Sequence, residues 1–290
     1  MNPDIFRPVE VPSDLSRYFR RAMVAFSNEP VDLEFVVRGT GYCYLGWTPG
    51  GRWEGVVDGE LQFDTDRDGP FHLSGQVFDG HVVCRSSGLL RQIFCEFSAI
   101  GQYELLGILG VETFERALNP VSVEPDLTPV RKALDSRTPL SGPDDLAHAM
   151  FSAVSKIAAA HQTPAYLADM VGVIEQSHGD VRIASVLAEA PFSERKAREE
   201  FGNIVGLSPK RFAKLLQINY AFGALLDLGE RRLADLALEC GFADQAHLTR
   251  SFAEFLGSSP IRFSRDIEPT LKQFVGLSRQ TNQSAKSIPE

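Results

Sequence analysis

Residues 201–212 read FGNIVGLSPKRF, and residues 252–263 read FAEFLGSSPIRF. The two stretches share a Phe, a Gly, a Ser, a Pro, an Arg and a final Phe at a constant offset of 51 residues. The Gly suits the left-handed residue after a helix, the Ser can cap the next helix, and Pro suits that helix's first position. Each copy therefore predicts a helix end, a tight turn and a new helix. The helix after the first copy is expected over about 209–227 and would link the two repeats.

Another helix pair precedes the second copy. Ala237 and Gly241 are four residues apart, which is the spacing of the small residue at the helix crossing and the glycine in the turn of a helix-turn-helix. Asp244 can cap the next helix, expected over about 244–256. Its buried stripe is predicted to consist of Leu248, Phe252 and Phe255.

The first copy has the same arrangement with a turn one residue shorter. Asp180 can cap the first helix, Pro191-Phe192 makes the turn, and Ser193 can cap a helix expected over about 193–205. The buried stripe of this helix is predicted to consist of Ala197, Phe201 and Ile204.

Two interpretations fit these helices. They either pack as an all-α domain, or they form two helix-turn-helix units that present one helix each to major-groove faces about 34 Å apart. The faces opposite the buried stripes are polar and favour the second interpretation, because Arg reads guanine, Gln reads adenine, and Thr and Ala can contact the thymine methyl. The candidates for base contact are Arg195, Arg198 and Glu199 in the first unit and Gln245, Ala246, Thr249 and Arg250 in the second.

The stretches LADLALECGFADQAHLTRSFAEFLGSSPIRF (233–263) and GLSPKRFAKLLQ (206–217) resemble the C-terminal region of the AraC/XylS family of bacterial transcription regulators. The resemblance covers about 175–266. It implies two helix-turn-helix units, double-stranded operator DNA as ligand and RNA polymerase as a plausible partner. Independently, the four cysteines lie far apart without a CxxC pair and fit no disulfide scaffold, so a reducing cytoplasm is the expected location. By position and by their place near helix starts, the phosphate-contact candidates are Lys196, Lys210, Arg211, His247 and Arg262.

The first unit departs from the family pattern. Pro191 stands where the family often has Gly, and Leu187 stands at the small-residue crossing. Its recognition helix also carries Glu194, Glu199 and Glu200, and acids near phosphates weaken binding unless Glu199 accepts from a cytosine amino group. We therefore expect the second unit to hold DNA more firmly.

The N-terminal part reads as strands separated by Gly-rich turns. The predicted strands are VDLEFVV, YCYLGW, RWEGVV, ELQFD, HVVCR and RQIFCEF, and Asp58-Gly59 and Asp79-Gly80 suit hairpin turns. These strands predict an antiparallel barrel or sandwich, so the fold class is α+β. FCEFSAIGQYELLGI (94–108) resembles the end of the cupin-like domain that precedes this module in some family members and that serves ligand sensing or dimerisation. The expected domains are a β-rich domain at 1–118, a connector with two helices at 119–177, the DNA-binding domain at 178–268 and a tail at 269–290.

Chemistry on the β-domain is the alternative, as a small-molecule-binding protein or enzyme whose helices are only structural. Against it, His72 and His81 form no HxH pair, so a metal site is not expected, and no GxSxG or GxxxxGK[ST] motif occurs. Cys43, Cys84 and Cys95 are either a thiol sensor or buried packing, and packing is favoured. We expect no catalysis and no cofactor, and the sequence does not identify an effector pocket.

Charge and hydropathy narrow the possible partners. The formal net charge is −9, with 10 basic and 17 acidic side chains in residues 1–120 but 12 and 13 in residues 175–266. Net charge therefore gives no sign of nucleic-acid binding, and any evidence for it must come from the arrangement of the side chains. Charges interrupt every apolar stretch before the about 20 residues that a membrane helix needs, and the first residues lack the apolar core of a secretory signal.

Overall fold

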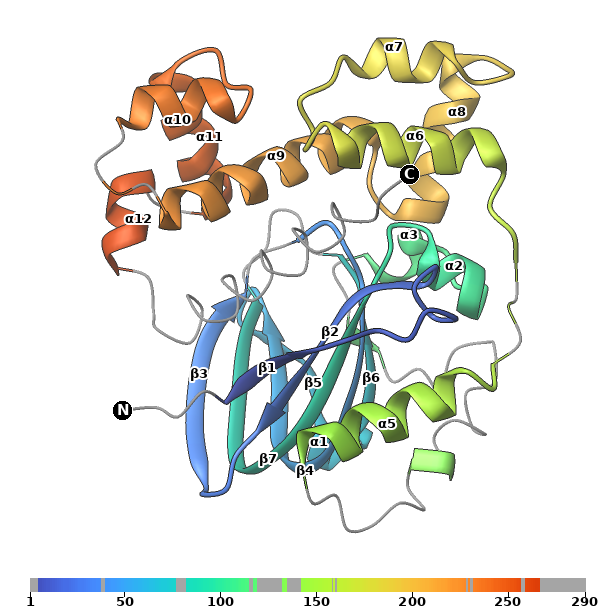
Figure 1. Ribbon diagram of the computed structural model, residues 1–290, viewed down its shortest axis with the longest axis vertical. Helices are drawn as coiled ribbons and strands as arrows, with labels where there is room; N and C mark the ends of the chain where they lie inside the picture. Colours follow the sequence, from blue (N-terminus) through green and yellow to red (C-terminus); the bar gives the residue numbers. More distant parts are fainter. Residues whose placement is uncertain are drawn as a thin grey trace.

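The computed structural model describes residues 5–37, 40–76, 82–114, 117–118, 132–134, 142–157, 159, 161–227, 229, 232–256 and 259–266. An antiparallel β-domain forms one half of the molecule, and a helical assembly lies across one end of it (Figure 1). The predicted α+β architecture is thereby confirmed. The strands are β1 (Phe6–Val9), β2 (Phe19–Phe26), β3 (Val31–Val37), β4 (Tyr44–Val57), β5 (Glu60–Asp64), β6 (Phe71–Ser74), β7 (Val82–Phe97) and β8 (Ala117–Leu118).

The described helices fall into two groups. Short helices and one longer helix accompany the sheet: α1 (Thr65–Asp68), α2 (Gly101–Leu106), α3 (Gly110–Thr113) and α5 (Pro143–Val154). The helical assembly comprises α6 (Ala165–Gln176), α7 (Ile183–Ala188), α8 (Glu194–Val205), α9 (Pro209–Leu226), α10 (Leu233–Glu239), α11 (Gln245–Leu256) and α12 (Pro260–Asp266). The two helices predicted between 145 and 177 are confirmed as α5 and α6.

Two long strands organise the sheet. Its order is β1-β2-β7-β4-β6-β8, with β3 also on β7 and β5 also on β4. β2 pairs with the second half of β7, and β3 pairs with its first half. Likewise, β6 pairs with the first half of β4, and β5 pairs with its second half. Each long strand therefore belongs to both halves of a folded sheet. Such sharing requires a bend in the middle of the strand.

The bend lies where the register between β4 and β7 shifts, on either side of Gly50. Gly51 has φ +76° and Gly88, beside it on β7, has φ +84°, conformations that favour glycine. The prediction of separate strands on either side of Pro49-Gly50-Gly51 was wrong. The irregularity bends the strand while pairing with β7 continues.

Other strand predictions had mixed outcomes. The segments HVVCR and RQIFCEF belong to one strand, β7, and no strand was predicted at β1, β2, β6 or β8. The hairpin at Asp58-Gly59 is confirmed, with φ of 49° and 86° at the two residues. The predicted turn at Asp79-Gly80, His81 and the predicted tail at 269–290 lie outside the described residues.

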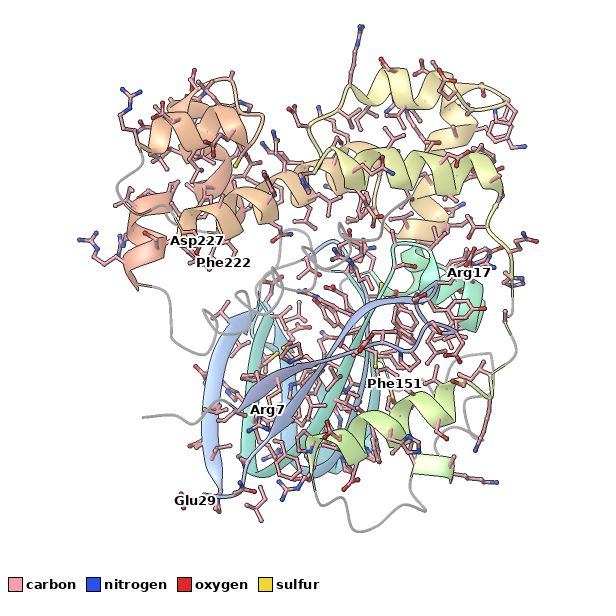
Figure 2. All side chains as sticks on the ribbon, viewed as in Figure 1. Arg7, Arg17, Glu29, Phe151, Phe222 and Asp227 are labelled. Atoms are coloured by element: carbon pink, nitrogen blue, oxygen red, sulfur yellow. The ribbon has the colours of Figure 1, made fainter. Side chains whose placement is uncertain are left out.

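The sheet buries both faces. One face packs Leu45, Ile93 and Cys95 against α5, whose Phe151 points toward the sheet (Figure 2). The other face encloses an aromatic cluster of Trp53, Phe63 and Phe94, with Trp53 stacked on His72 at 4.1 Å between ring centroids. Because both faces pack against apolar side chains, neighbouring residues of the long strands can both be hydrophobic, and simple alternation with polar residues is lost.

Candidate nucleic-acid interface

Side-chain caps start the helices that matter most. The Ser193 hydroxyl accepts from the Lys196 amide at the start of α8, and the Ser208 hydroxyl accepts from the Arg211 amide at the start of α9. Asp244 Oδ1 accepts from the His247 amide at 2.6 Å, directly before α11. These predicted caps are confirmed, and they set α8 and α11 within one residue of the predicted bounds.

The second helix-turn-helix, α10 and α11, has the predicted turn. Ala237 is fully buried where the helices cross, Gly241 has φ +75°, and the buried Phe242 donates its amide to Ala237 O at 2.9 Å. Leu248 and Phe252 are fully buried, and Phe255 is half-buried. The predicted stripe thus anchors α11 and leaves its opposite face outward.

The first unit, α7 and α8, differs in its details. Leu187 is fully buried where a small residue would usually stand, together with Ala197 and Phe201 of α8. Ile204 is half-buried and packs against the same core cluster, so the predicted stripe faces inward, and Val205 is a further buried position of α8. The N-cap of α7 is Arg182, so the prediction that Asp180 caps this helix was wrong.

The predicted base-contact residues lie on the outer faces. Six are exposed and Thr249 is half-buried. On α8, Arg198 pairs with Glu194 at 3.3 Å and Lys196 pairs with Glu200 at 3.6 Å, so cations and acids of this helix face one another. Exposed pairs of this kind contribute little to stability, but they reduce the net positive field that DNA would meet.

The outer face of α11 carries different chemistry. Its sequence, QAHLTRSFAEFL, contains one acid, Glu254, in the second half of the helix. Arg250 is exposed, and His247 is half-buried with its ring edge-on to Phe242. Its Nδ1 accepts from the Ala243 amide at 3.4 Å. The start of α11 is therefore a rigid polar surface without a carboxylate of its own.

The phosphate-contact candidates lie near helix starts. Lys196, Lys210, Arg211 and Arg262 are exposed in the first turns of α8, α9 and α12. Lys196 also lies over the Phe192 ring at 4.5 Å from its centroid. Backbone N–H groups at these helix starts add to the positive potential that attracts phosphate.

The β-domain holds the first unit by backbone contact. Gln76 Nε2 donates to Val205 O at the end of α8, and α3 lies against the same end (Figure 1). A Cβ at Gly110 would lie 2.4 Å from the Gly206 nitrogen, so the two glycines permit a backbone approach that no side chain allows. This contact was not predicted, because nothing local in the sequence marks it.

A buried charge cluster leads from the sheet to α6 and α9 of the helical assembly. Glu96 of β7 accepts from the guanidinium groups of Arg21 and Arg20 and from the Tyr44 hydroxyl. Burial raises the pKa of Glu96, but the two arginines outweigh it, so its pKa lies below its usual value. Glu96 therefore stays ionised inside the sheet.

The cluster continues into α6. The Arg20 guanidinium lies 3.9 Å from the centre of the Tyr42 ring, and the Tyr42 hydroxyl donates to Glu175 at 2.8 Å. Tyr42 also meets Phe212 of α9 edge-on, and Asn219 Nδ2 donates to Thr40 O at 3.2 Å. Burial raises the pKa of Glu175 despite the Tyr42 hydrogen bond. One continuous set of contacts thus joins β2, β7, α6 and α9.

The three thiols of the β-domain and His72 are buried. Cys43, Cys84 and Cys95 are buried, as the packing interpretation predicted, and burial raises the pKa of Cys43 and of Cys84 to about 12. Burial lowers the pKa of His72 to about 3, which keeps it neutral. Within the described ranges, no three His, Cys, Asp or Glu side chains form a metal-binding group, and no helix has the length and hydropathy to cross a membrane.

Comparisons with known proteins agree with this arrangement. A family model described as a helix-turn-helix domain matches residues 186–266. The virulence regulon transcriptional activator VirF of Yersinia enterocolitica is 35% identical over 63 residues, which cover 22% of this chain and 23% of VirF. The HTH-type transcriptional regulator ExsA of Pseudomonas aeruginosa is 34% identical over 65 residues, again 22% of this chain and 23% of the relative. The match thus spans less than a quarter of these curated relatives.

Solved structures resemble the chain more broadly and more weakly. The crystal structure of ToxT from Vibrio cholerae O395 has a TM-score of 0.42 at 12% identity, covering 94% of this chain and 98% of ToxT. The helices and the sequence matches over them therefore identify the type of the C-terminal domain. The C-terminal region of this chain is a helix-turn-helix domain of the AraC type.

Proposed function

We propose that this chain is a sequence-specific transcription regulator that binds double-stranded operator DNA through α8 and α11. The observation that carries the proposal is the pair of capped helices, one at each end of α9, whose buried stripes leave polar faces outward. Successive faces of one DNA groove repeat every ~34 Å, and two such units read two of them.

The base-reading roles follow from side-chain chemistry. Arg250, Arg195 and Arg198 suit guanine O6 and N7, and Gln245 suits an adenine edge. Thr249 and Ala246 suit a thymine methyl, and Glu199 suits a cytosine amino group. The phosphate contacts are assigned to Lys196, Lys210, Arg211, His247 and Arg262. We expect the second unit to supply most of the affinity, because α11 carries one acid, Glu254, whereas α8 carries three.

The β-domain supplies control in this proposal. Gln76 and α3 of this domain contact the end of α8 in the first unit, and the charge cluster contacts α6 directly before that unit. A small-molecule effector, a homodimer made through this domain and contact with RNA polymerase are the partners that such a regulator would use. We assign the control role to residues 1–118, the connector to 119–177 and DNA binding to 178–268, and we place the protein in the cytoplasm, with no catalytic step.

Genome-wide mapping of bound DNA tests the proposal and identifies its targets. A binding titration of the full chain on a mapped fragment then measures log K against log salt concentration. We expect a negative slope of about 0.9 per neutralised phosphate. An Arg211→Ala variant should reduce the magnitude of the slope by about 0.9, the share of one phosphate contact. Arg7→Ala, which removes the same charge from β1, is the matched control (Figure 2). Absence of enriched sites and of any salt-dependent binding at low ionic strength would refute the proposal.

A further inference from the structure

Three segments of the helical assembly meet around Gln217. Gln217 lies in the middle of α9 and is 8% exposed. Its Nε2 donates to Cys240 O at 3.0 Å and to Gly241 O at 2.9 Å. These carbonyls lie just past the end of α10, where the regular hydrogen-bond ladder of a helix stops. One side-chain amide thus serves two acceptors in the turn of the second unit.

The segment before the first unit reaches the same place. Gly179 has φ +82°, and a Cβ there would lie 1.9 Å from Ala213 O and 3.0 Å from the Gln217 nitrogen. A Cβ at Gly241 would lie 2.3 Å from Asp180 Cγ. Asp180, predicted as a helix cap, therefore packs against the turn of the other unit. We call Gly179, Asp180, Gln217, Cys240 and Gly241 the junction.

A second brace reaches the recognition helix of the second unit. Lys214 Nζ donates to Ser251 Oγ of α11 at 2.6 Å and lies 4.9 Å from the centre of the Phe242 ring. Ser251 is 4% exposed. The linker helix is thus fastened to the turn and to the helix of the second unit by separate side chains.

We propose that Gln217 is a positioning residue that fixes the distance and rotation between α8 and α11, and so makes the protein selective for the spacing of its two DNA contact segments. The inference rests on the proposed function. One added base pair shifts a segment by ~3.4 Å along the axis and rotates it by about 35°. A rigid pair of units cannot follow such a shift, whereas a pair that moves independently can.

The DNA test compares spacings. Duplexes selected from a random pool by the wild-type full chain are footprinted to locate the two protected segments, and one base pair is then inserted or removed between them. We expect wild type to lose about tenfold or more in affinity, the range of one poor base-pair contact. Gln217→Met, which keeps the length but removes the donors, should lose less than about threefold on the same change, with weaker binding to the original duplex.

Asn219→Leu is the matched control. Asn219 lies two residues from Gln217 on α9 and donates to the β-domain at Thr40 O. Because this contact leads to the sheet, the variant should keep the wild-type spacing penalty. An equal penalty in Gln217→Met and wild type would overturn the inference while leaving the proposed function standing, and absence of any selected duplex would remove the proposed function itself.

A DNA-free measurement covers the case in which Gln217→Met weakens the fold. Spin labels are placed at Asn203→Cys on α8 and Ala253→Cys on α11, which are exposed, while the four native cysteines are buried. The distance distribution should be narrow in the otherwise wild-type chain and in Asn219→Leu, and broader in Gln217→Met with helix content unchanged. A distribution in Gln217→Met as narrow as in wild type would contradict the positioning role.

Discussion

The two helix-turn-helix units share a sequence pattern but differ in what holds them. The first, α7 and α8, ends against α3 and accepts a hydrogen bond from Gln76 of the β-domain. The second, α10 and α11, is fastened to α9 through Gln217 and Lys214. The helix α8 of the first unit carries three acids, two of which pair with its own cations, whereas α11 of the second carries one, Glu254. Under the proposed function, this difference suits the first unit to control and the second to affinity.

The largest expected effect falls on the buried charge cluster that joins the sheet to α6. Glu96→Gln deprives Arg21 and Arg20 of this carboxylate, which should lower the free energy of unfolding by about 3–5 kcal/mol in urea titrations at pH 7. Because the pKa of Glu96 is lowered in the fold, its stabilisation exists above its usual pKa and is lost as the pH falls through the lowered value. The difference from wild type should therefore shrink in acid.

The control for this change is Glu34→Gln. Glu34 pairs with Arg85 on the surface, with both side chains more than half exposed, and such pairs contribute ~0–1 kcal/mol. If Glu96→Gln cost no more than Glu34→Gln, the buried cluster would not support the contact between the sheet and α6.

The next largest effect falls on the second unit. Gly241→Ala introduces a side chain at φ +75° against Asp180, which should cost about 1–3 kcal/mol. Hydrogen exchange should show lost protection in α10 and α11 while the β-domain keeps its own. Gly202→Ala in α8 meets nothing within 4 Å and is expected to stabilise by roughly 0.5–1 kcal/mol. Equal loss of protection in α7 and α8 and in α10 and α11 would show that the two units are not held independently.

DNA affinity gives a third comparison. Arg250→Ala should weaken binding to a selected duplex by about 1–3 kcal/mol, the range of a good base contact. Arg195→Ala should cost less than about 1 kcal/mol, because Glu194 and Glu199 on the same helix already oppose the phosphates. Fluorescence anisotropy on one duplex at one salt concentration measures both, with Arg7→Ala as the control. The reverse ranking would show that the first unit dominates.

The smallest effect concerns the link between the sheet and α6. Glu175→Gln keeps an oxygen that accepts the Tyr42 hydroxyl hydrogen bond. It also removes the charge of a carboxyl group whose pKa is raised by burial. A raised pKa means that the stabilisation by Glu175 exists below its usual pKa and is lost as the pH rises through the folded value. The variant should therefore equal wild type in acid and exceed it by less than ~1 kcal/mol at pH 7 in thermal unfolding. A variant less stable than wild type at pH 7 would show that the charge itself is needed.

Part of the fold could be predicted because its signals are local. Ser193, Ser208 and Asp244 cap helices that begin at the next residue. Gly241 has a positive φ, which glycine adopts without a steric penalty, so the turn is also marked locally. Helix periodicity then places Phe201 and Phe252 inward and the polar residues outward. The strands were less predictable, because β4 and β7 bury both faces and lack simple alternation, and because the glycines at their bend look like a turn.

Local patterns in the amino-acid sequence therefore predict α8 and α11, their caps, their polar faces and the α9 helix between them, since these depend on interactions over one or two helical turns. Only the tertiary structure decided that Glu96 meets Arg20 and Arg21, that Gln76 reaches the end of α8, and that Asp180 packs on Gly241 rather than capping a helix. These pairs are separated by many tens of residues. No local preference distinguishes such partners, so the way that the sheet and the helices pack together selects them.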